Sequence, residues 1–322
     1  MKPVVQVKDL ETTFFLKSGP FRAVNRISYE INQGETLGIV GESGCGKSVT
    51  SFSLMRLIDR PGQITNGEFL LNGQNIFSLN ESQIENVRGG KMAMIFQEPM
   101  TALNPVLTIG YQMDEQIKKH MNLNKKDTRD RAIEMLQLVG IPSAGERYES
   151  YPHQLSGGMR QRAMIAMALS CNPQFLIADE PTTALDVTIQ AQILELFQGL
   201  QEKLNMSVQF ITHDLGVISE VSDKVMVMYG GQTCETGPTQ DILNSPRHPY
   251  TAALIESRPK MGHRVHRLKT IEGSVPAPHE FPKGCPFANR CSRVKTECWS
   301  TKPRIQAVNG SPNRTVACFN PL

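Results

Sequence analysis

The amino-acid sequence predicts an α/β protein in which helices surround a largely parallel sheet. Apolar runs typical of buried strands occur at residues 36–40, 175–178, 208–211 and 225–229. Stretches with apolar residues three and four positions apart lie between them, and strands that alternate with helices in this way form parallel sheets. The chain has 322 residues, of which 39% are hydrophobic and 20% charged, which is enough for one large domain or two smaller ones.

The remaining elements follow from local patterns. Residues 4–7 and 27–31 alternate as strands do, and residues 67–77 predict a hairpin, because Asn72-Gly73 suits a type I′ turn. From Glu81 to about Tyr148 the pattern becomes helical. After about Gly237 prolines become frequent, which predicts an appended tail with little regular structure.

Charge and hydropathy argue against two classes of function. The formal net charge is +3 and the basic residues are scattered, which favours a solvated surface over nucleic-acid binding. The first residues carry no apolar stretch with a small-residue cleavage site. The longest apolar run, residues 163–169, is far shorter than the about 20 residues that cross a bilayer. We expect a cytosolic chain, or one held at a membrane by something else.

The octet "GESGCGKS", residues 41–48, fits the phosphate-loop pattern G-x-x-x-x-G-K-[ST]. It follows a predicted strand and precedes a predicted helix. In that context backbone N–H groups at the helix N-terminus surround phosphate oxygens. Lys47 is then expected to meet the β- and γ-phosphates and Ser48 to bind Mg²⁺. The alternative is a glycine-rich turn without a ligand.

A second motif, "FLIADEP", is an apolar strand that ends in two acids. Asp179 suits a magnesium ion, and Glu180 would orient or deprotonate an attacking water. An ordinary strand end is the alternative. Gln97 lies between the two motifs, and His213 follows a later strand, where a structural histidine is the other interpretation. "LSGG", residues 155–158, places two glycines before a helix, a pattern that a flexible helix cap also explains.

In this order the motifs resemble the nucleotide-binding subunit of an ABC transporter, over about residues 4–237. The resemblance implies a P-loop NTPase core of ABC type with an antiparallel β subdomain and a helical subdomain at about residues 88–165. The nucleotide-binding domain would span residues 1–237 and the C-terminal extension residues 238–322.

The resemblance also implies the residues of an ATP site. Glu180, His213 and Lys47 would be catalytic, and Ser48, Gln97 and Asp179 would hold Mg²⁺. Ser156, Gly157, Gly158 and Asp186 would serve the ATP bound by an opposite subunit. The nucleotide itself would be bound by Phe14, Gly41, Ser43, Gly44, Cys45, Gly46, Lys47, Ser48, Val49 and Gln97, with Phe15 and Phe21 as competitors of Phe14 for the adenine.

The tail carries four of the seven cysteines, spaced Cys285-x₅-Cys291-x₆-Cys298-x₁₉-Cys318. Four thiolates can hold Zn²⁺ or a [4Fe–4S] cluster. The spacing lacks the C-x₂-C pairs of common zinc sites. Residues 245–259 resemble the extension of the dipeptide and oligopeptide importer branch, and that resemblance implies a cluster of structural role. Zinc, or cysteines without a ligand, are the alternatives.

The expected function is that of an ATP-hydrolysing subunit that powers an importer for dipeptides or oligopeptides. The implied partners are a second ATP-binding subunit, expected to be a paralogue, two transmembrane permease subunits that dock near residues 97–110, and a solute-binding protein outside the membrane. The chain would then lie at the cytoplasmic face of the membrane. Other cargoes (nickel or a metal chelate, glutathione, an oligosaccharide), a soluble non-transport ATPase and a non-catalytic regulatory subunit are the alternatives.

Overall fold

The computed structural model describes residues 3–97, 102–183, 186–257, 270–277 and 280–322. The chain divides into two compact units, which we describe one at a time. Unit 1 comprises Met1–Val5, Ile31–Glu35 and Leu71–Gln209, and unit 2 comprises Gln6–Glu30, Thr36–Leu70 and Phe210–Leu322.

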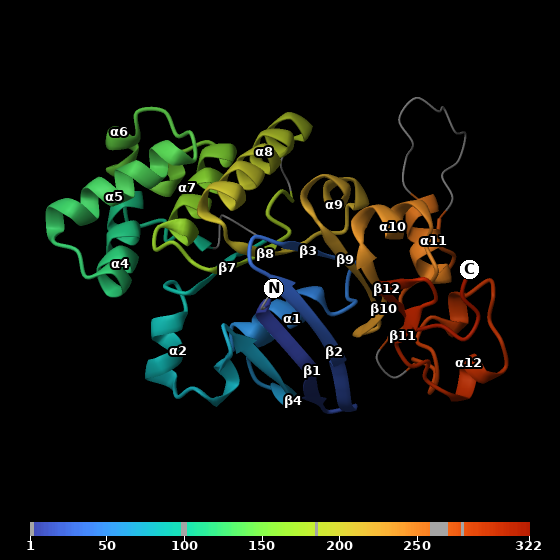
Figure 1. The fold of residues 1–322 in the computed structure, drawn as a ribbon. Coiled ribbons are helices and arrows are strands. Elements are labelled where there is room, and N and C mark those ends of the chain that lie inside the picture. The colour runs from blue at the N-terminus through green and yellow to red at the C-terminus, as the bar shows by residue number, and fades with distance from the viewer. Residues whose placement is uncertain (1–2, 98–101, 184–185, 258–269, 278–279) are drawn as a thin grey trace. The chain divides into compact units, whose positions relative to one another are not determined.

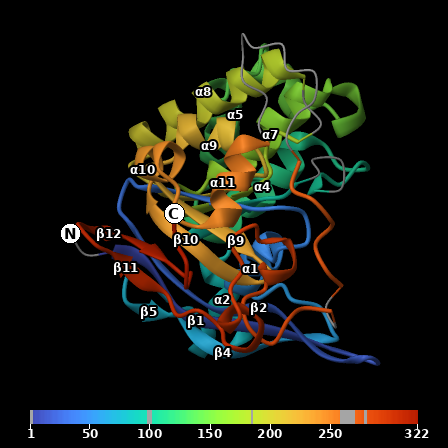
Figure 2. The ribbon, with the colours of Figure 1, turned by 90° about the vertical axis from the view of Figure 1, so that its right-hand side faces the viewer.

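Unit 2 contains two sheets. In one of them the strands follow the order β2-β1-β4, and in the other β11-β12-β10-β9-β3 (Figures 1 and 2). The strands are β1 (Pro3–Leu16), β2 (Gly19–Asn32), β3 (Thr36–Val40), β4 (Gly62–Leu71), β9 (Lys224–Tyr229), β10 (Gln232–Pro238), β11 (Gln306–Val308) and β12 (Ser311–Val316).

The centre of the second sheet is a parallel pair. Strand β3 runs beside β9 with Leu37 opposite Lys224 and Val40 opposite Val227. All five residues of β3 are buried, as the uninterrupted apolar run predicts. The chain leaves β3 at its carboxyl end and enters α1 (Lys47–Leu54). That edge of a parallel sheet is where ligands bind in α/β folds, so this loop is well placed for a site.

The C-terminal region is more regular than the proline-rich sequence predicts. Strand β12 pairs antiparallel with β10, with Glu235 opposite Val316, and β11 pairs with β12 (Figure 2). Between β10 and these strands lie α10 (Thr239–Asn244), α11 (Pro249–Glu256), η3 (Ala288–Arg290) and α12 (Glu297–Ser300). The prediction of an irregular tail is therefore wrong for these segments, which extend the sheet of unit 2 and cover part of it.

Unit 1 joins parallel strands to a group of helices. Strands β6 (Met92–Ile95) and β7 (Phe175–Asp179) pair in parallel, and β8 (Ser207–Ile211) follows β7 in the strand order. Helix α5 packs against α4, α6 and α7 (Figure 1). The helices are α2 (Glu81–Val87), α4 (Ile109–Met121), α5 (Lys125–Leu138), α6 (Ala144–Tyr148), α7 (Gly157–Leu169) and α8 (Val187–Leu204).

The stretch that the sequence predicts as helical, residues 88–165, includes one strand. Its first described element is β6, whose four residues are all buried. A run of four apolar residues has neither a helical nor an alternating pattern, so its sequence is compatible with both structures. Helix α4 begins at Ile109, where the Thr108 side chain accepts a hydrogen bond from the Tyr111 N–H and caps the helix.

Candidate active site

The loop between β3 and α1 in unit 2 holds the predicted phosphate-binding octet, residues 41–48. Two of its three glycines, Gly41 and Gly46, occupy positions where a side chain does not fit. A Cβ on Gly41 would collide with the carbonyl oxygen of Met228, and one on Gly46 with that of Ala23. Gly46 also has a φ of 100°, a conformation that favours glycine. The loop backbone is thus held tightly between the ends of its neighbouring strands.

Lys47 begins α1, and its side chain folds back over the loop. The Nζ atom donates hydrogen bonds to the carbonyl oxygens of Gly41, at 2.7 Å, and Glu42, at 3.1 Å. Only 6% of Lys47 is exposed. Two backbone oxygens therefore fix the position of the positive charge within the loop.

The other predicted nucleotide-binding residues of the loop and of α1 differ in burial. Ser43 and Gly44 are exposed, and Ser48 and Val49 are half-buried in the first turn of α1. Cys45 is fully buried, and this burial raises the pKa of its thiol. The Cys45 side chain is thus a neutral packing group beneath the loop.

The predicted adenine-stacking ring, Phe14, lies on β1 and is half-buried. A Cβ on Gly62 would lie 2.8 Å from Phe14 Cε1, so the ring packs against Gly62. Its neighbour Phe15 is 50% exposed. Stacking of Phe14 on adenine stays a prediction, with Phe15 the more open of the two rings.

In unit 1 the end of β7 carries the two predicted acids. Asp179 is 2% exposed and is the last residue of the strand. Glu180 follows with a φ of 47°, a left-handed backbone conformation that is uncommon outside glycine and that recurs at functional sites. The Glu180 Oε2 atom accepts hydrogen bonds from Gln97 Nε2, at 3.2 Å, and Thr183 Oγ1, at 2.9 Å. The structure thus brings Gln97 and Glu180 together.

The glycine pair of "LSGG" opens helix α7, and Ser156 caps it by accepting a hydrogen bond from the Met159 N–H at 3.3 Å. Ser156 and Gly157 are exposed. Within the described part of the chain, no atom beyond its neighbours lies within 4 Å of a Cβ built on Gly157, whereas one on Gly158 meets Ile189 Cγ2 at 3.3 Å. The helix N-terminus is therefore accessible from outside the chain.

Two further residues of the predicted ATP sites, Asp186 and His213, lie just before helices. Asp186 caps α8 by accepting a hydrogen bond from the Ile189 N–H at 2.9 Å and is exposed. His213, in unit 2, is exposed on the short segment between β8 and α9 (Leu215–Val221). Part of the segment predicted to dock the permeases, residues 98–101, lies outside the described residues. Residues 184–185, directly before Asp186, also lie outside them.

Two residues of this region were not predicted from the sequence. Thr183 binds the Glu180 carboxylate, and the buried Gln161 of α7 donates a hydrogen bond to the carbonyl oxygen of Pro181. Gln161 lies five residues after Ser156, so this bond connects helix α7 to the segment that follows Glu180. Neither Thr183 nor Gln161 belongs to a recognisable sequence motif, so their roles are visible only in the folded structure.

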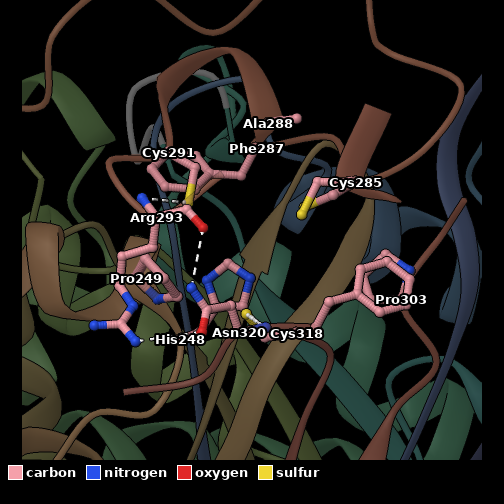
Figure 3. A pocket seen from close by; sticks show the side chains of 12 residues that line it. His248, Pro249, Cys285, Phe287, Ala288, Cys291, Arg293, Pro303, Cys318 and Asn320 are labelled. Atoms are coloured by element: carbon pink, nitrogen blue, oxygen red, sulfur yellow. Dashed lines mark hydrogen bonds between the residues drawn. The ribbon is translucent and has the colours of Figure 1, made fainter. Parts of the chain in front are cut away.

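The four tail cysteines line one pocket of unit 2 together with His248 and Phe287. Figure 3 shows Cys285, Cys291 and Cys318 on different sides of it. Backbone N–H groups donate to three of the sulfurs: Arg293 to Cys291, at 3.4 Å, Lys295 to Cys298, at 3.4 Å, and Asn320 to Cys318, at 3.3 Å. Burial raises the pKa of Cys285 to about 11.

The sulfurs nevertheless do not form the predicted ligand group. Among the described residues, no three His, Cys, Asp or Glu side chains come close enough to hold a metal ion. Three of the sulfurs accept hydrogen bonds from N–H groups two or three residues away, within their own turns. The prediction of a formed metal site is thus corrected to four cysteines around a common pocket.

No helix in the described ranges is both long enough and apolar enough to cross a membrane.

Two family models match the sequence. The model described as "ABC transporter" matches residues 24–183, and the model described as "Oligopeptide/dipeptide transporter, C-terminal region" matches residues 234–298. The first covers the phosphate loop, "LSGG" and the acids after β7. The second covers the first three of the four tail cysteines.

Among curated proteins, the oligopeptide transport ATP-binding protein AppD of Bacillus subtilis is 49% identical over 320 residues, covering 99% of this chain and 97% of that protein. The dipeptide transport ATP-binding protein DppD of Escherichia coli is 48% identical over 319 residues, with the same coverage of 99% and 97%. Among solved structures, the dimeric ATP-binding cassette MJ0796 bound to ADP and phosphate gives a TM-score of 0.65 at 27% identity, covering 73% of this chain and 98% of that one.

Proposed function

Because this chain belongs to the ATP-binding subunits of ABC transporters and is an ATPase of that class, we propose that it powers an importer of dipeptides or oligopeptides. The observation that carries the proposal is the extent of the similarity. It spans 99% of the chain and includes residues 234–298, which match the model described as "Oligopeptide/dipeptide transporter, C-terminal region".

The proposed chemistry is attack of water on the γ-phosphate of ATP. Lys47, which the Gly41 and Glu42 carbonyls hold in place, offsets negative charge on the β- and γ-phosphates. Glu180 accepts the proton of the attacking water, and the hydrogen bonds from Gln97 and Thr183 orient its carboxylate for this role. His213 and Gln97 contact the γ-phosphate and report its presence.

The donor set suits magnesium. Asp179 is a carboxylate at the buried end of β7, and Ser48 offers a hydroxyl in the first turn of α1. Hard oxygen ligands of this kind are those that Mg²⁺ prefers. We assign Ser48, Gln97 and Asp179 to the ion, which would offset phosphate charge when bound.

A second ATP-binding subunit completes each site in this proposal. Ser156 and Gly157 are exposed at the N-terminus of α7, where the backbone N–H groups and the helix dipole favour an anion. Open space beside Gly157 lets the γ-phosphate on the opposite subunit approach. We assign the exposed Asp186 to the same ATP molecule. The opposite subunit is a paralogue in our proposal.

Two permease subunits and an external solute-binding protein are the remaining proposed partners. Val106 is 74% exposed and Tyr111 58% exposed, in the segment after Gln97. Both side chains are thus open to contact with another protein. We propose that the permeases dock here and hold the chain at the cytoplasmic face of the membrane.

We further propose that the four tail cysteines bind a [4Fe–4S] cluster with a structural role. The four cysteines line one pocket, and their spacing lacks the C-x₂-C pairs of common zinc sites, which supports the cluster over zinc. Backbone N–H groups bonded to the sulfurs are a feature that tunes such sites. Iron, sulfide and zinc analysis of anaerobically purified protein tests this: about four irons per chain support it, and one zinc without iron refutes it.

Uptake by cells tests the cargo. In a strain that lacks this chain, uptake of a radiolabelled dipeptide or oligopeptide should fall and should return when the wild-type chain is supplied. The Glu180→Gln variant, produced to the same level, should not restore it. Unchanged peptide uptake in the deletion strain, together with lost uptake of nickel or glutathione, would refute the peptide assignment while leaving the ATPase assignment intact.

A further inference from the structure

Arg290 connects the cysteine-bearing tail to the phosphate loop. It ends η3 and directly precedes Cys291. Its Nη1 atom lies 2.6 Å from Glu42 Oε2, and its Nη2 atom lies 3.0 Å from Glu42 Oε1. The two residues are 248 positions apart in the sequence. A planar guanidinium that meets both oxygens of a carboxylate makes the strongest common type of side-chain ion pair.

The guanidinium is held rigidly by other groups as well. The Arg290 side chain is 4% exposed. Its Nε atom donates to the carbonyl oxygen of Glu272 at 2.9 Å, and Nη2 donates to the carbonyl oxygens of Ile271 and Gly273, both at 3.3 Å. Nη1 also donates to the Tyr229 hydroxyl at 3.2 Å. These partners fix the orientation of Arg290 before any nucleotide binds.

Glu42 belongs to the frame of the phosphate loop. Its carbonyl oxygen accepts from Lys47 Nζ at 3.1 Å and from the Cys45 N–H at 3.3 Å. Its own N–H donates to the hydroxyl of Tyr250 at 2.9 Å. The ring of Tyr250 packs against those of Tyr229 and Phe287, so the tail contacts the loop through an aromatic cluster as well as through the ion pair. Movement of the Glu42 backbone would displace both Lys47 and Cys45.

The charge of Glu42 has a direct consequence for an anionic ligand. A carboxylate in a loop that binds a triphosphate repels that ligand, because both carry negative charge. The positive guanidinium of Arg290 lies at hydrogen-bond distance from the Glu42 carboxylate and offsets its negative charge. The phosphate loop can therefore contain Glu42 without losing affinity for phosphate.

We infer that Arg290 is a positioning residue for nucleotide binding: it neutralises Glu42 and holds the first half of the phosphate loop, so that the cysteine-bearing tail contributes to ATP affinity. This inference rests on the assignment of residues 41–48 as the phosphate loop. It gives the tail a role in the ATP site of its own chain, in addition to any role in folding.

The test is a comparison of single and double variants of the full chain. The Kd of a fluorescent ATP analogue with Mg²⁺ is measured beside the thermal midpoint of the nucleotide-free protein. Arg290→Ala should raise this Kd about ten-fold, equivalent to 1.4 kcal/mol. Adding Glu42→Gln to Arg290→Ala removes the uncompensated charge and should bring the Kd back to within about three-fold of that of Glu42→Gln alone. A purely structural role would not give this rescue.

Two control variants make the outcome decisive. Arg293→Ala changes an arginine of the same segment whose side chain binds Asn320 and Pro321, and it should leave the Kd unchanged. Lys47→Ala should abolish binding; if it does not, the phosphate-loop assignment fails, which is a different result from failure of the inference. If Arg290→Ala does not fold, Arg290→Gln can still donate to the carbonyls of residues 271–273 and carries the same test. An unchanged Kd in the Arg290 variant, or a double variant that binds as weakly as the single one, would overturn the inference.

Discussion

The side-chain amide of Gln97 lies 3.2 Å from the carboxylate of Glu180, and Thr183 binds the same oxygen. Gln97 is exposed and precedes the segment proposed to dock the permeases, whereas Glu180 lies at the end of a buried strand. The orientation of the proposed base therefore depends on a residue that a docked partner could displace. This is a physical route by which the state of a permease would alter ATP hydrolysis.

Thr183→Val should lower kcat about five-fold without changing the affinity for ATP, because it removes one hydrogen bond to the charged Glu180, worth on the order of 1 kcal/mol. Steady-state hydrolysis by the assembled transporter measures kcat, and nucleotide titration measures affinity. Thr183→Ser keeps the hydroxyl and should retain the wild-type kcat. Equal kcat values for the valine and serine variants would show that Thr183 does not position the base.

Arg314→Ala should destabilise unit 2 by about 3–5 kcal/mol, since it leaves a charge buried without its partner. Glu235 is fully buried, and its Oε1 lies 2.7 Å from Arg314 Nη2. The measurement is the free energy of urea unfolding. Lys8→Ala removes one partner of an exposed pair, Lys8–Glu68, and should cost at most about 1 kcal/mol. Equal effects of the two variants would contradict a structural role for the buried pair.

Acid should weaken the C-terminal region through His248. This residue caps α11, where its Nδ1 accepts the Tyr250 N–H at 3.0 Å. Burial lowers its pKa to about 4, whereas its pKa in the unfolded chain is about 6.5. The unfolded state therefore binds more protons between these values. The stability that the neutral ring provides is complete above pH about 6.5 and is lost as pH falls toward 4, on the order of 3 kcal/mol in total.

His248→Asn separates this effect from general acid denaturation. Asparagine caps a helix without titrating, so the variant should lose less stability than the wild type between pH 7 and pH 5. Urea unfolding at the two pH values provides the comparison. The same loss in both proteins would rule out His248 as the titrating group.

The parts of the site that the sequence predicts are those with fixed spacing. The octet at residues 41–48 needs no tertiary information, since its glycines, lysine and serine follow one another between a strand and a helix. The turn at Asn72-Gly73 is confirmed in the same way, with φ values of 50° and 80° that suit a type I′ turn. Local chemistry determines both features.

The parts that could not be predicted depend on contacts between distant segments. Strand β12 lacks apolar alternation because Arg314, one of its buried residues, is charged, and its burial depends on Glu235, 79 positions earlier. The Arg290–Glu42 pair likewise joins residues 248 positions apart, and nothing in either local sequence points to the other. Only the folded chain shows these two ion pairs. Strand β6 could not be predicted for a different reason, because its four residues are too few to show a period.

The most direct test of the account is ATP hydrolysis by the purified transporter that contains either the wild-type chain or Glu180→Gln. The substitution keeps the size of the side chain and removes the proposed base. We predict that kcat falls by at least about 10²-fold, while the Kd for MgATP stays within about three-fold of the wild-type value. A variant that hydrolyses ATP at close to the wild-type rate would contradict the assignment of Glu180, and with it the proposed mechanism.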